Sequence, residues 1–569
     1  MFPPEVQRII LLIGLAATGY LLVLAWNEDY MQSSTPTEHS AAPDVDDAPA
    51  TDIPQAGVAT TEDSSDIPDV SLIGTEGELL ASRPALPTGT NRLVRVTTPT
   101  LDVWIDRLGG DVRRVHLPKF PVELSSPDLP YELLNVGNGR IYIAQSGLIG
   151  PDGLDSGNDR PLFKTSQSRY ELTGDGTLEV LFEAVHNDVN VEKKFVFTGD
   201  EYLVDVSYRV QNNLNRPFQA SLFAQIKRDD KEPEGDERAG FGPAPYVGAA
   251  VTTPDSRYHK IEFEDLDDED FRATVTGGWI AFLQHYFLSA WIANEDQDNI
   301  YYGRKRSDGT YIVGYTGPLK SIPAGASGEW RTRFYAGPKA QKRLEEISEN
   351  LNLTVDYGFL WWLAVPLFWL LDWLHGILAN WGAAIILLTV LVKLTLYPLS
   401  AASYKSMANM RRVAPQMKRL QERYADDKQK LSQEMMSFYK KEKVNPLGGC
   451  LPMLLPMPIF IALYWVLFES VELRQAPFVL WIEDLAAMDP YFVLPLLMGG
   501  TMYFQQTLSP AMGDPMQQRM MKMMPIMFTV LFLFFPAGLV LYWLVNSVLS
   551  IAQQWYVIKR TESAAAAKG

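Results

Sequence analysis

The sequence WGAAIILLTVLVKLTLYPLS, residues 381–400, decides the fold of this chain. It is almost wholly apolar and about as long as the ~20 residues that a helix needs to cross a bilayer. The following stretch, 401–445, has eleven Lys and Arg side chains against five Asp and Glu, a local charge of +6 in a chain of −18. Basic loops stay on the cytoplasmic side of a membrane. The two segments therefore predict a membrane protein whose residues 401–446 lie in the cytoplasm.

Composition excludes several classes of protein. The chain has 569 residues, of which 47% are hydrophobic, but an acidic polar half and an apolar half contribute very differently to this average. Its one cysteine, Cys450, excludes a disulfide within the chain and a metal cluster built from several Cys. Neither a phosphate-binding loop nor an HExxH pair occurs, so we expect no cofactor and no metal. The negative charge argues against DNA as a partner, since phosphate contacts need clustered cations.

The N-terminal part predicts an anchor and a spacer. Residues 9–26 form an uncharged run behind Arg8 and indicate that 1–26 is a membrane anchor. A cleaved signal peptide is the alternative, although the run is longer than a usual signal-peptide core and no A-x-A site follows it. Residues 27–90 are rich in Pro, Ser, Thr, Ala, Asp and Glu, which predicts a disordered acidic tether.

Residues 91–338 predict a large β-sandwich. Short runs with β-branched alternation, such as KKFVFTGDEYLVDVSYRVQN (193–212), are separated by turn signals. The segment GGWIAFLQHYFLSAWI (277–292) is apolar in both phases, so we expect its strands to be buried on both faces. It contains His285, which could act as a general base. A buried or rim histidine with its hydrogen bonds satisfied is the favoured interpretation, because no carboxylate or nucleophile stands beside it in the sequence.

Two apolar pieces precede the basic stretch, and only one of them can cross the membrane. Residues 339–380 hold a charged linker helix and YGFLWWLAVPLFWLLDWLHGIL (357–378). If both the N-terminus and residues 401–446 are cytoplasmic, an odd number of spans separates them. We assign the crossing to 381–400 and expect 357–378 to lie along the outer membrane interface, because it holds four Trp, Pro366 and Asp372.

The rest of the chain predicts a helical hairpin and four more spans. The hairpin has helices over 402–424 and 427–443, with Asp426 as N-cap and Gln429 at the reciprocal capping position. Spans follow within 450–556, at about 450–470, 491–508, 520–535 and 537–554, and 557–569 form a cytoplasmic tail. The fold class is therefore a multi-span α-helical membrane protein with six spans, both ends inside, and one large β-sandwich domain.

Lys393 is the only basic side chain deep inside a predicted span, and such a group indicates a functional site because its burial is costly. Its long stem could instead reach the cytoplasmic interface. Other polar residues lie in the spans, which indicates a wet cavity between helices or simply hydrogen bonds that join them. They are Thr389, Thr501, Gln505, Gln506, Thr529, Tyr542, Asn546, Ser547 and Ser550. Nine Met residues between 498 and 527 suit either an adaptable binding surface or ordinary core packing.

The second half resembles the YidC/Oxa/Alb family of membrane protein insertases, specifically and almost throughout 357–556. The resemblance is carried by YKSMANMRRVAPQMKRLQERYADDKQKLSQEMMSFYKKEKVNPLGGCLPMLLPMPIFIALYWVL (404–467), SVELRQAPFVLWIEDL (470–485), DPYFVLPLLMGG (489–500), DPMQQRMMKMMPIMFTVLF (514–532) and FPAGLVLYWLVNS (535–547). The anchor, tether and β-rich domain resemble the Gram-negative members more weakly.

The resemblance implies an insertase and chaperone, without a catalytic reaction, in the bacterial inner membrane. It would insert and fold newly made membrane proteins, alone or with the Sec translocon and its accessory subunits, in contact with the lipid bilayer. Five spans would form the core and enclose a hydrophilic groove, where the family carries an Arg and this chain has Lys393. Pro456 is a second departure, at a position where a polar residue is expected. The implied groove residues are Lys393, Thr389, Gln505, Thr529, Tyr542 and Asn546.

The resemblance also implies two surfaces. A hydrophobic slide, along which substrate helices reach the lipid, falls on Phe460, Leu463, Phe528, Leu531 and Trp543. Weak contact with the ribosome would be made by the hairpin, the 509–519 loop and the short tail. The ribosome-facing residues are Arg411, Arg412, Lys418, Arg419, Lys440 and Lys441.

Three alternatives remain open on the sequence alone. An anion-binding transporter would use Lys393 as its binding group, but no inverted repeat supports it. A scaffold associated with the Sec translocon would need no groove. A membrane-anchored, periplasmic carbohydrate-active enzyme would use the β-sandwich, but no catalytic acid–base pair can be identified in its strands.

Overall fold

The computed structural model describes residues 67–68, 92–137, 139–155, 160–186, 188–233, 245–424, 427–442, 456–508 and 515–566. All of them belong to one compact unit, Glu62–Gly569. The predicted anchor 1–26 and almost all of the predicted tether lie outside the described residues. Ile67 is the exception, because it is buried against Ile149 and Phe223 of the β domain. The prediction of a disordered tether is therefore wrong at this residue.

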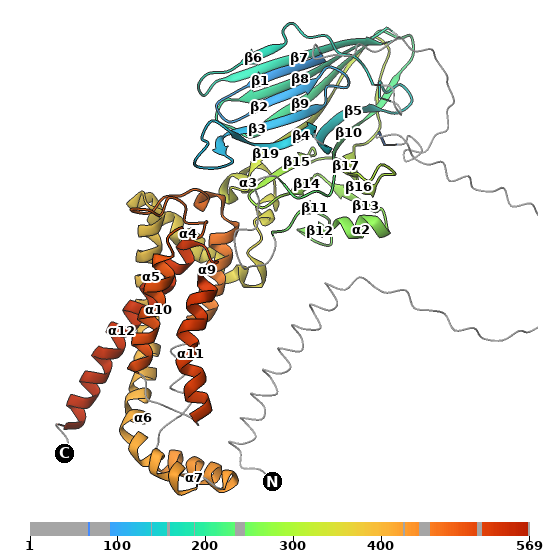
Figure 1. The fold of residues 1–569 in the computed structure, drawn as a ribbon. Helices are drawn as coiled ribbons and strands as arrows, with labels where there is room; N and C mark the ends of the chain where they lie inside the picture. Colours follow the sequence, from blue (N-terminus) through green and yellow to red (C-terminus); the bar gives the residue numbers. More distant parts are fainter. Residues whose placement is uncertain are drawn as a thin grey trace, which may run out of the picture. The chain divides into compact units, whose positions relative to one another are not determined.

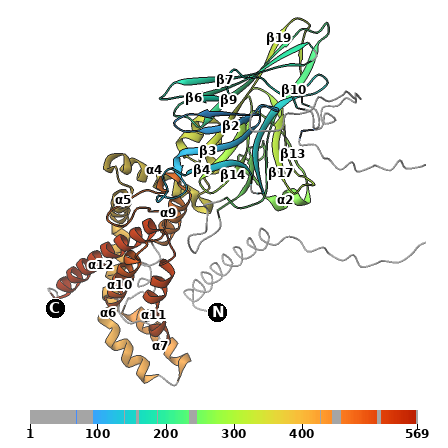
Figure 2. The same ribbon diagram turned by 45° about the horizontal axis from the view of Figure 1, so that its top comes forward.

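The first part of the unit is a β-sandwich, as predicted (Figures 1 and 2). An eleven-stranded sheet has the order β13-β16-β17-β10-β5-β4-β3-β2-β1-β6, with β18 paired to β10, and an eight-stranded sheet has the order β12-β11-β14-β15-β19-β9-β8-β7. Apolar side chains of both sheets form one core, among them Val103, Val206 and Ile226.

The strands of the first sheet are β1 Leu93–Thr97, β2 Asp102–Asp106, β3 Val112–Pro121, β4 Pro130–Gly137, β5 Arg140–Ile149, β6 Arg169–Glu171, β10 Phe218–Arg228, β13 Phe271–Thr276, β16 Asp298–Lys305, β17 Tyr311–Thr316 and β18 Lys320–Ile322. Those of the second are β7 Thr177–His186, β8 Val189–Thr198, β9 Leu203–Asn212, β11 Gly248–Val251, β12 His259–Ile261, β14 Trp279–Leu283, β15 Phe287–Ile292 and β19 Ser327–Pro338. A short helix, α2 (Phe263–Asp268), precedes β13.

The central strands β14 and β15 are buried on both faces, as predicted. One set of their side chains, such as Ile280 and Trp291, belongs to the core between the sheets. The other set, such as Trp279 and Leu288, belongs to a second apolar cluster that continues into the helices of the second half. The run is apolar in both phases because each phase faces a different core.

A cluster of charged side chains lies inside the sandwich. Lys193 occupies an inward position of β8, and its Nζ donates to the backbone oxygens of Gly109 (3.0 Å), Gly110 (2.8 Å) and Ser146 (3.2 Å). Arg160 beside it forms ion pairs with Asp111 and Asp155. Burial lowers the pKa of Lys193 to about 7, although the nearby carboxylate of Asp111 opposes this shift.

The second part is helical. The linker holds α3 (Gln341–Ile347), η3 (Leu351–Thr354) and η4 (Gly358–Leu360). The longer helices are α4 (Trp361–Leu378), α5 (Trp381–Thr395), α6 (Tyr397–Arg423), α7 (Lys428–Lys441), α9 (Met457–Glu469), α10 (Val493–Thr507), α11 (Pro515–Phe532) and α12 (Ala537–Ala566), and η6 (Val471–Leu473) follows α9. Helices therefore occupy each of the last four predicted spans.

Length and composition single out one span among the described residues. Gly358–Leu378, formed by η4 and α4, is long and apolar enough to cross a membrane by itself. The pair α5 and α6 passes the same test only together, as one span bent by 67°. The predicted crossing at 381–400 is thus interrupted. A new helix begins at Tyr397 because Pro398 fits the first turn of a helix and removes one backbone donor.

The hairpin exists, but its boundaries differ from those predicted. Its first helix, α6, begins at Tyr397 rather than 402 and so continues almost directly from α5. The N-cap of α7 is Asp427, whose Oδ1 accepts a hydrogen bond from the backbone N–H of Lys430 (2.9 Å). The predicted box of Asp426 and Gln429 is therefore wrong by one residue. Met410, Val413 and Met417 of α6 pack with side chains of α7, which closes the hairpin.

The last helix is longer than expected. We predicted a span ending near 554 and a separate tail, whereas α12 continues to Ala566. Residues 551–566 contain no Pro or Gly and several strong helix formers, so nothing in this stretch ends the helix.

Candidate functional site

Lys393 lies at the contact between α5 and α12. Its Nζ donates to Ser550 Oγ (2.6 Å) and Asn546 Oδ1 (3.2 Å), both on α12. The side chain therefore turns inward between helices instead of extending along α5 toward the cytoplasmic end. Both partners are neutral, and none of the ion pairs among the described residues involves Lys393. The site thus holds a positive charge that no carboxylate of the described residues neutralises.

The sequence of α5 explains this direction. Asn380 caps the helix, since its Oδ1 accepts from the backbone N–H of Ala383 (2.9 Å). Ile385 and Thr389 are buried at a four-residue spacing on the face of α5 that packs on its neighbours. Lys393 is the next residue in this series, so it lies on the same face one turn further along.

The other predicted groove residues lie in two groups. Thr389 is one turn from Lys393 and fully buried, but its hydroxyl donates to Ile385 O (2.7 Å) and so does not face an open cavity. Tyr542 is buried on α12 one turn before Asn546. Thr389 is therefore on the same face of α5 as Lys393, and Tyr542, whose ring stacks on Phe460, is on the same side of α12 as Asn546.

Gln505 and Thr529 form the second group. Gln505 lies on α10, and Thr529 lies on α11, where its hydroxyl donates to Pro525 O (2.7 Å). Gly499 permits close packing of these helices, because a Cβ there would collide with Thr529. No described hydrogen bond joins either residue to Lys393.

The α12 surface supplies partners that the groove prediction omitted. Ser550 makes the shorter of the two hydrogen bonds with Lys393. It follows Asn546 by one helical turn, and this four-residue spacing could have indicated from the sequence that both residues face Lys393. Gln553 and Gln554 continue the polar side of α12, and each has a buried side-chain oxygen without a hydrogen-bond partner. A polar seam, formed by Lys393, Asn546, Ser550, Gln553 and Gln554, thus runs along α12.

Most of the predicted hydrophobic slide forms an aromatic surface on three helices. Phe460 of α9 contacts Trp543 of α12, with ring centroids 4.7 Å apart, and Phe528 of α11 stacks on the same Trp543 at 6.3 Å. Leu531 of α11 is half-buried. Trp543, only 8% exposed, and the fully buried Leu463 can support this surface only from behind.

The basic residues of the hairpin are accessible. Arg411, Arg412 and Arg419 on α6 and Lys440 and Lys441 on α7 are exposed, whereas the side chain of Lys418 and the 509–514 part of the predicted loop lie outside the described residues. The exposed cations lie on the helix faces opposite the apolar contact between α6 and α7. The hairpin therefore presents positive charge to solvent.

His285 has a structural role, as predicted. It is buried, and its Nε2 is 2.9 Å from Phe468 O, to which the neutral imidazole donates. Its ring also stacks on Tyr286 and contacts the tilted ring of Phe468. Burial, together with the charge of Lys339, lowers the pKa of His285 to about 3, so the ring is neutral at any physiological pH.

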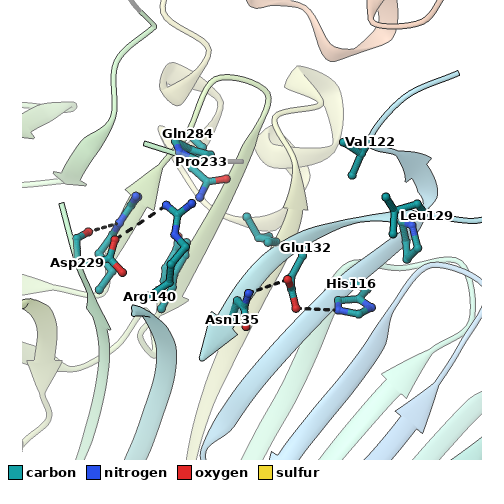
Figure 3. Close-up of a pocket in the computed structure, with 13 residues that line it drawn as sticks. His116, Val122, Leu129, Glu132, Asn135, Arg140, Asp229, Pro233 and Gln284 are labelled. Atoms are coloured by element: carbon teal, nitrogen blue, oxygen red, sulfur yellow. Dashed lines mark hydrogen bonds and ion pairs between the residues drawn. The ribbon is translucent and has the colours of Figure 1, made fainter. Parts of the chain in front are cut away.

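The β domain contains a pocket of about 250 Å³ between β3, β4, β5 and β10 (Figure 3). Its carboxylates already have structural partners. Glu132 accepts hydrogen bonds from Asn135 (2.7 Å) and contacts His116 (3.0 Å), and Asp229 accepts from the backbone N–H groups of Ile141 and Lys231. The pocket therefore offers no free acid–base pair to a carbohydrate-active enzyme.

Comparisons with known proteins agree with this arrangement. The model of the YidC periplasmic domain matches residues 93–370, and that of the 60Kd inner membrane protein family matches 373–564. The chain is 50% identical to a membrane protein insertase YidC of Azotobacter vinelandii over 99% of both chains, and 49% identical to that of Stutzerimonas stutzeri over 99% of both. The chain belongs to the YidC family of membrane protein insertases.

Solved structures give weaker similarity. A crystal structure of an active YidC insertase is 18% identical and has a TM-score of 0.38, covering 82% of this chain and 93% of its own. A galactose mutarotase-like protein from Lactobacillus casei has a TM-score of 0.31 at 9% identity, covering 43% of this chain and 99% of its own.

Family membership makes this chain an insertase of the bacterial inner membrane with a periplasmic β domain, not an enzyme. The sequence-based identification of the family is thereby confirmed, and nothing in the comparisons supports a transporter. Among the described residues, no group of three His, Cys, Asp or Glu side chains could hold a metal ion. Within the YidC family, the question for this chain is how Lys393 and the aromatic surface serve insertion.

Proposed function

We propose that Lys393 attracts the acidic, translocated end of a new membrane protein, while the apolar helix of that substrate passes into lipid along the aromatic surface of Phe460 and Phe528, which Trp543 supports from behind. The observation that carries this proposal is that Lys393 forms no ion pair within the part of the chain that the structure describes. Its two partners are neutral, so an acidic substrate segment can supply the missing counter-charge.

The driving force comes from the substrate. A helix of ~20 apolar residues gains about 25 cal/mol for each Å² of apolar surface that leaves water, whereas its polar tail loses hydration in hydrocarbon. The polar seam on α12 offers hydrogen bonds to that tail, and Lys393 offers it a charge. Both lower the barrier to crossing without a source of chemical energy.

The proposed topology has six spans with both ends in the cytoplasm. The exposed cations of α6 and α7 support a cytoplasmic hairpin. We assign one crossing to α5 and place α4 along the outer interface, where its exposed Trp361, Trp369 and Trp373 suit the headgroup region. In a Cys450→Ser background, Trp373→Cys should be labelled by a membrane-impermeant maleimide from outside, and labelling only from inside would contradict this topology.

The proposed partners are nascent membrane proteins, the Sec translocon with its accessory subunits, and, weakly, the ribosome. The ribosome proposal is supported by the exposed cations of the hairpin, and the Sec proposal rests on family membership.

Site-specific photocrosslinking tests the proposed path. A photoreactive residue at Phe460 should crosslink to ribosome-stalled chains that carry an emerging membrane helix. The matched control is the same probe at Leu496, an exposed apolar residue of α10 outside the aromatic surface. With acidic-tailed substrates, Lys393→Arg should keep the crosslinks and Lys393→Glu should lose them. Equal crosslinking of both variants, or equal yields at 460 and 496, would refute the proposal.

A further inference from the structure

The β domain is joined to the C-terminal end of α9 by the ends of two neighbouring strands. β15 and β19 are paired, with Phe287 opposite Pro338, so the residues just outside this pair lie side by side. These residues are His285, before β15, and Lys339, after β19. Lys339 N–H also donates to Tyr286 O (2.8 Å), which fixes the two chain segments together.

Lys339 and Glu469 form a buried ion pair across this contact. Nζ of Lys339 lies 2.9 Å from Oε2 of Glu469, and the side chains are only 4% and 6% exposed. Glu469 is the last residue of α9. A buried charge is costly unless its partner is present, so each of these residues depends on the other for its place in the fold.

Hydrogen bonds to backbone oxygens lie on both sides of the pair. His285 bonds to Phe468 O, one residue before Glu469. On the other side, Nη2 of Arg474 donates to Pro121 O (2.9 Å) and Val122 O (3.2 Å) at the end of β3. The β domain therefore holds the end of α9 at several points, on both sides of Glu469.

We propose that Lys339 and Glu469 are positioning residues for insertion: through them the β domain sets the position of α9 and so of its aromatic surface. Phe460 lies nine residues before Glu469 on the same helix, roughly 13 Å away along its axis. A helix held at one end can move at the other only by tilting or bending. This inference rests on the substrate path proposed above.

The test combines a distance between labels with substrate crosslinking, both in the full chain in lipid. In a Cys450→Ser background, nitroxide labels at Val185→Cys on β7 and Pro458→Cys on α9 report the distance between the β domain and α9. The variants are Glu469→Gln and the charge exchange Lys339→Glu with Glu469→Lys. The control is Glu179→Gln, which breaks the exposed ion pair of Glu179 with Lys194.

Glu469→Gln should at least double the width of the distance distribution and reduce crosslinking from residue 460 at least fivefold. The charge exchange should restore both, and the control should change neither. Unchanged widths in folded Glu469→Gln, or broadened widths with crosslinking within twofold of the parent, would overturn the proposal. If Glu469→Gln does not accumulate, an accumulating charge exchange with lost crosslinks would overturn it too. A parent chain without crosslinks at 460 would refute the substrate path, while the distances would still report on the ion pair.

Discussion

The β domain and the helical domain each contain a buried or partly buried lysine, Lys193 and Lys393, but they surround its positive charge with different groups. Lys193 donates three hydrogen bonds to backbone oxygens, and Asp111, Asp155 and Arg160 surround it. Lys393 has two neutral side-chain partners. Burial alone therefore does not mark a functional lysine. The difference is whether the protein itself supplies the counter-charge.

Substitution of Lys193 should have the largest effect on folding. Lys193→Met removes three buried hydrogen bonds and one positive charge from beside two carboxylates, although Arg160 still donates to Gly109 O and Ser146 O. We expect the β domain to lose about 3–5 kcal/mol of stability, measured as the free energy of opening from amide exchange of β5 and β8 in the full chain. Unchanged exchange rates would show that the two lysines are not structurally different, which breaks the comparison.

Acidification should test the boundary between the two regions. His285 has a pKa of about 3 when folded and 6.5 when unfolded, so below pH 6.5 the unfolded state binds a proton that the folded state does not. The free energy of unfolding should therefore decrease as the pH is lowered, by about 2 kcal/mol at pH 5. This decrease can be measured as a lower free energy of local opening of β15, obtained from amide exchange. His285→Gln keeps a donor for Phe468 O and should remove most of this pH dependence; an equal dependence in both chains would contradict the assignment.

Substitution of Lys393 should affect function and not folding. Lys393→Met removes a charge that has no partner charge among the described residues, so amide exchange of α5 and α12 should stay within about twofold of the parent. Insertion of substrates with acidic tails should fall about tenfold, which corresponds to about 1.4 kcal/mol. Insertion of substrates with neutral tails should change little. Loss of folded protein in this variant would make Lys393 structural, like Lys193.

The smallest effect is expected from Ser550. Ser550→Ala removes one of two hydrogen bonds that hold Lys393 and leaves its charge in place. We expect insertion of acidic-tailed substrates to fall by about two- to threefold, in line with roughly 0.5–1 kcal/mol for one hydrogen bond. Ser563→Ala, an exposed serine on the same helix that bonds to Lys559 O, is the control. Equal effects of the two substitutions would show that Ser550 does not support Lys393.

Features set by local periodicity could be predicted from the sequence. The double-phase apolar run of β14 and β15 and the two-helix hairpin follow from spacing along one segment. Spacing also places Lys393 on the same face of α5 as Thr389, but it left open whether the side chain turns inward or reaches the cytoplasmic interface. Lys193 could have been found in the same way, because VNVEKKFVF places residues 189, 191, 193, 195 and 197 on one face of β8. The alternation therefore places Lys193 in the core, where its ammonium group needs buried hydrogen-bond partners.

Features that depend on distant residues could not be predicted. Glu469 looks like an ordinary acidic helix end until Lys339, 130 residues earlier, is placed beside it. Leu463 is an apolar residue of the same helix as Phe460, and only the packing of the helices shows that its side chain is buried. Helix ends also depended on competing local signals, since adjacent Asp426 and Asp427 are equally good caps by type.

The separation of Lys339 and Glu469 also imposes an order on biogenesis. At 5–20 residues per second, a ribosome needs roughly 7–26 s to make the 130 residues between them. During that interval β19 is complete, but the ammonium group of Lys339, the residue after this strand, cannot yet pair with the carboxylate of Glu469. Docking of the β domain on α9 must therefore be a late step, which an insertase molecule completes only after most of its own chain has been synthesised.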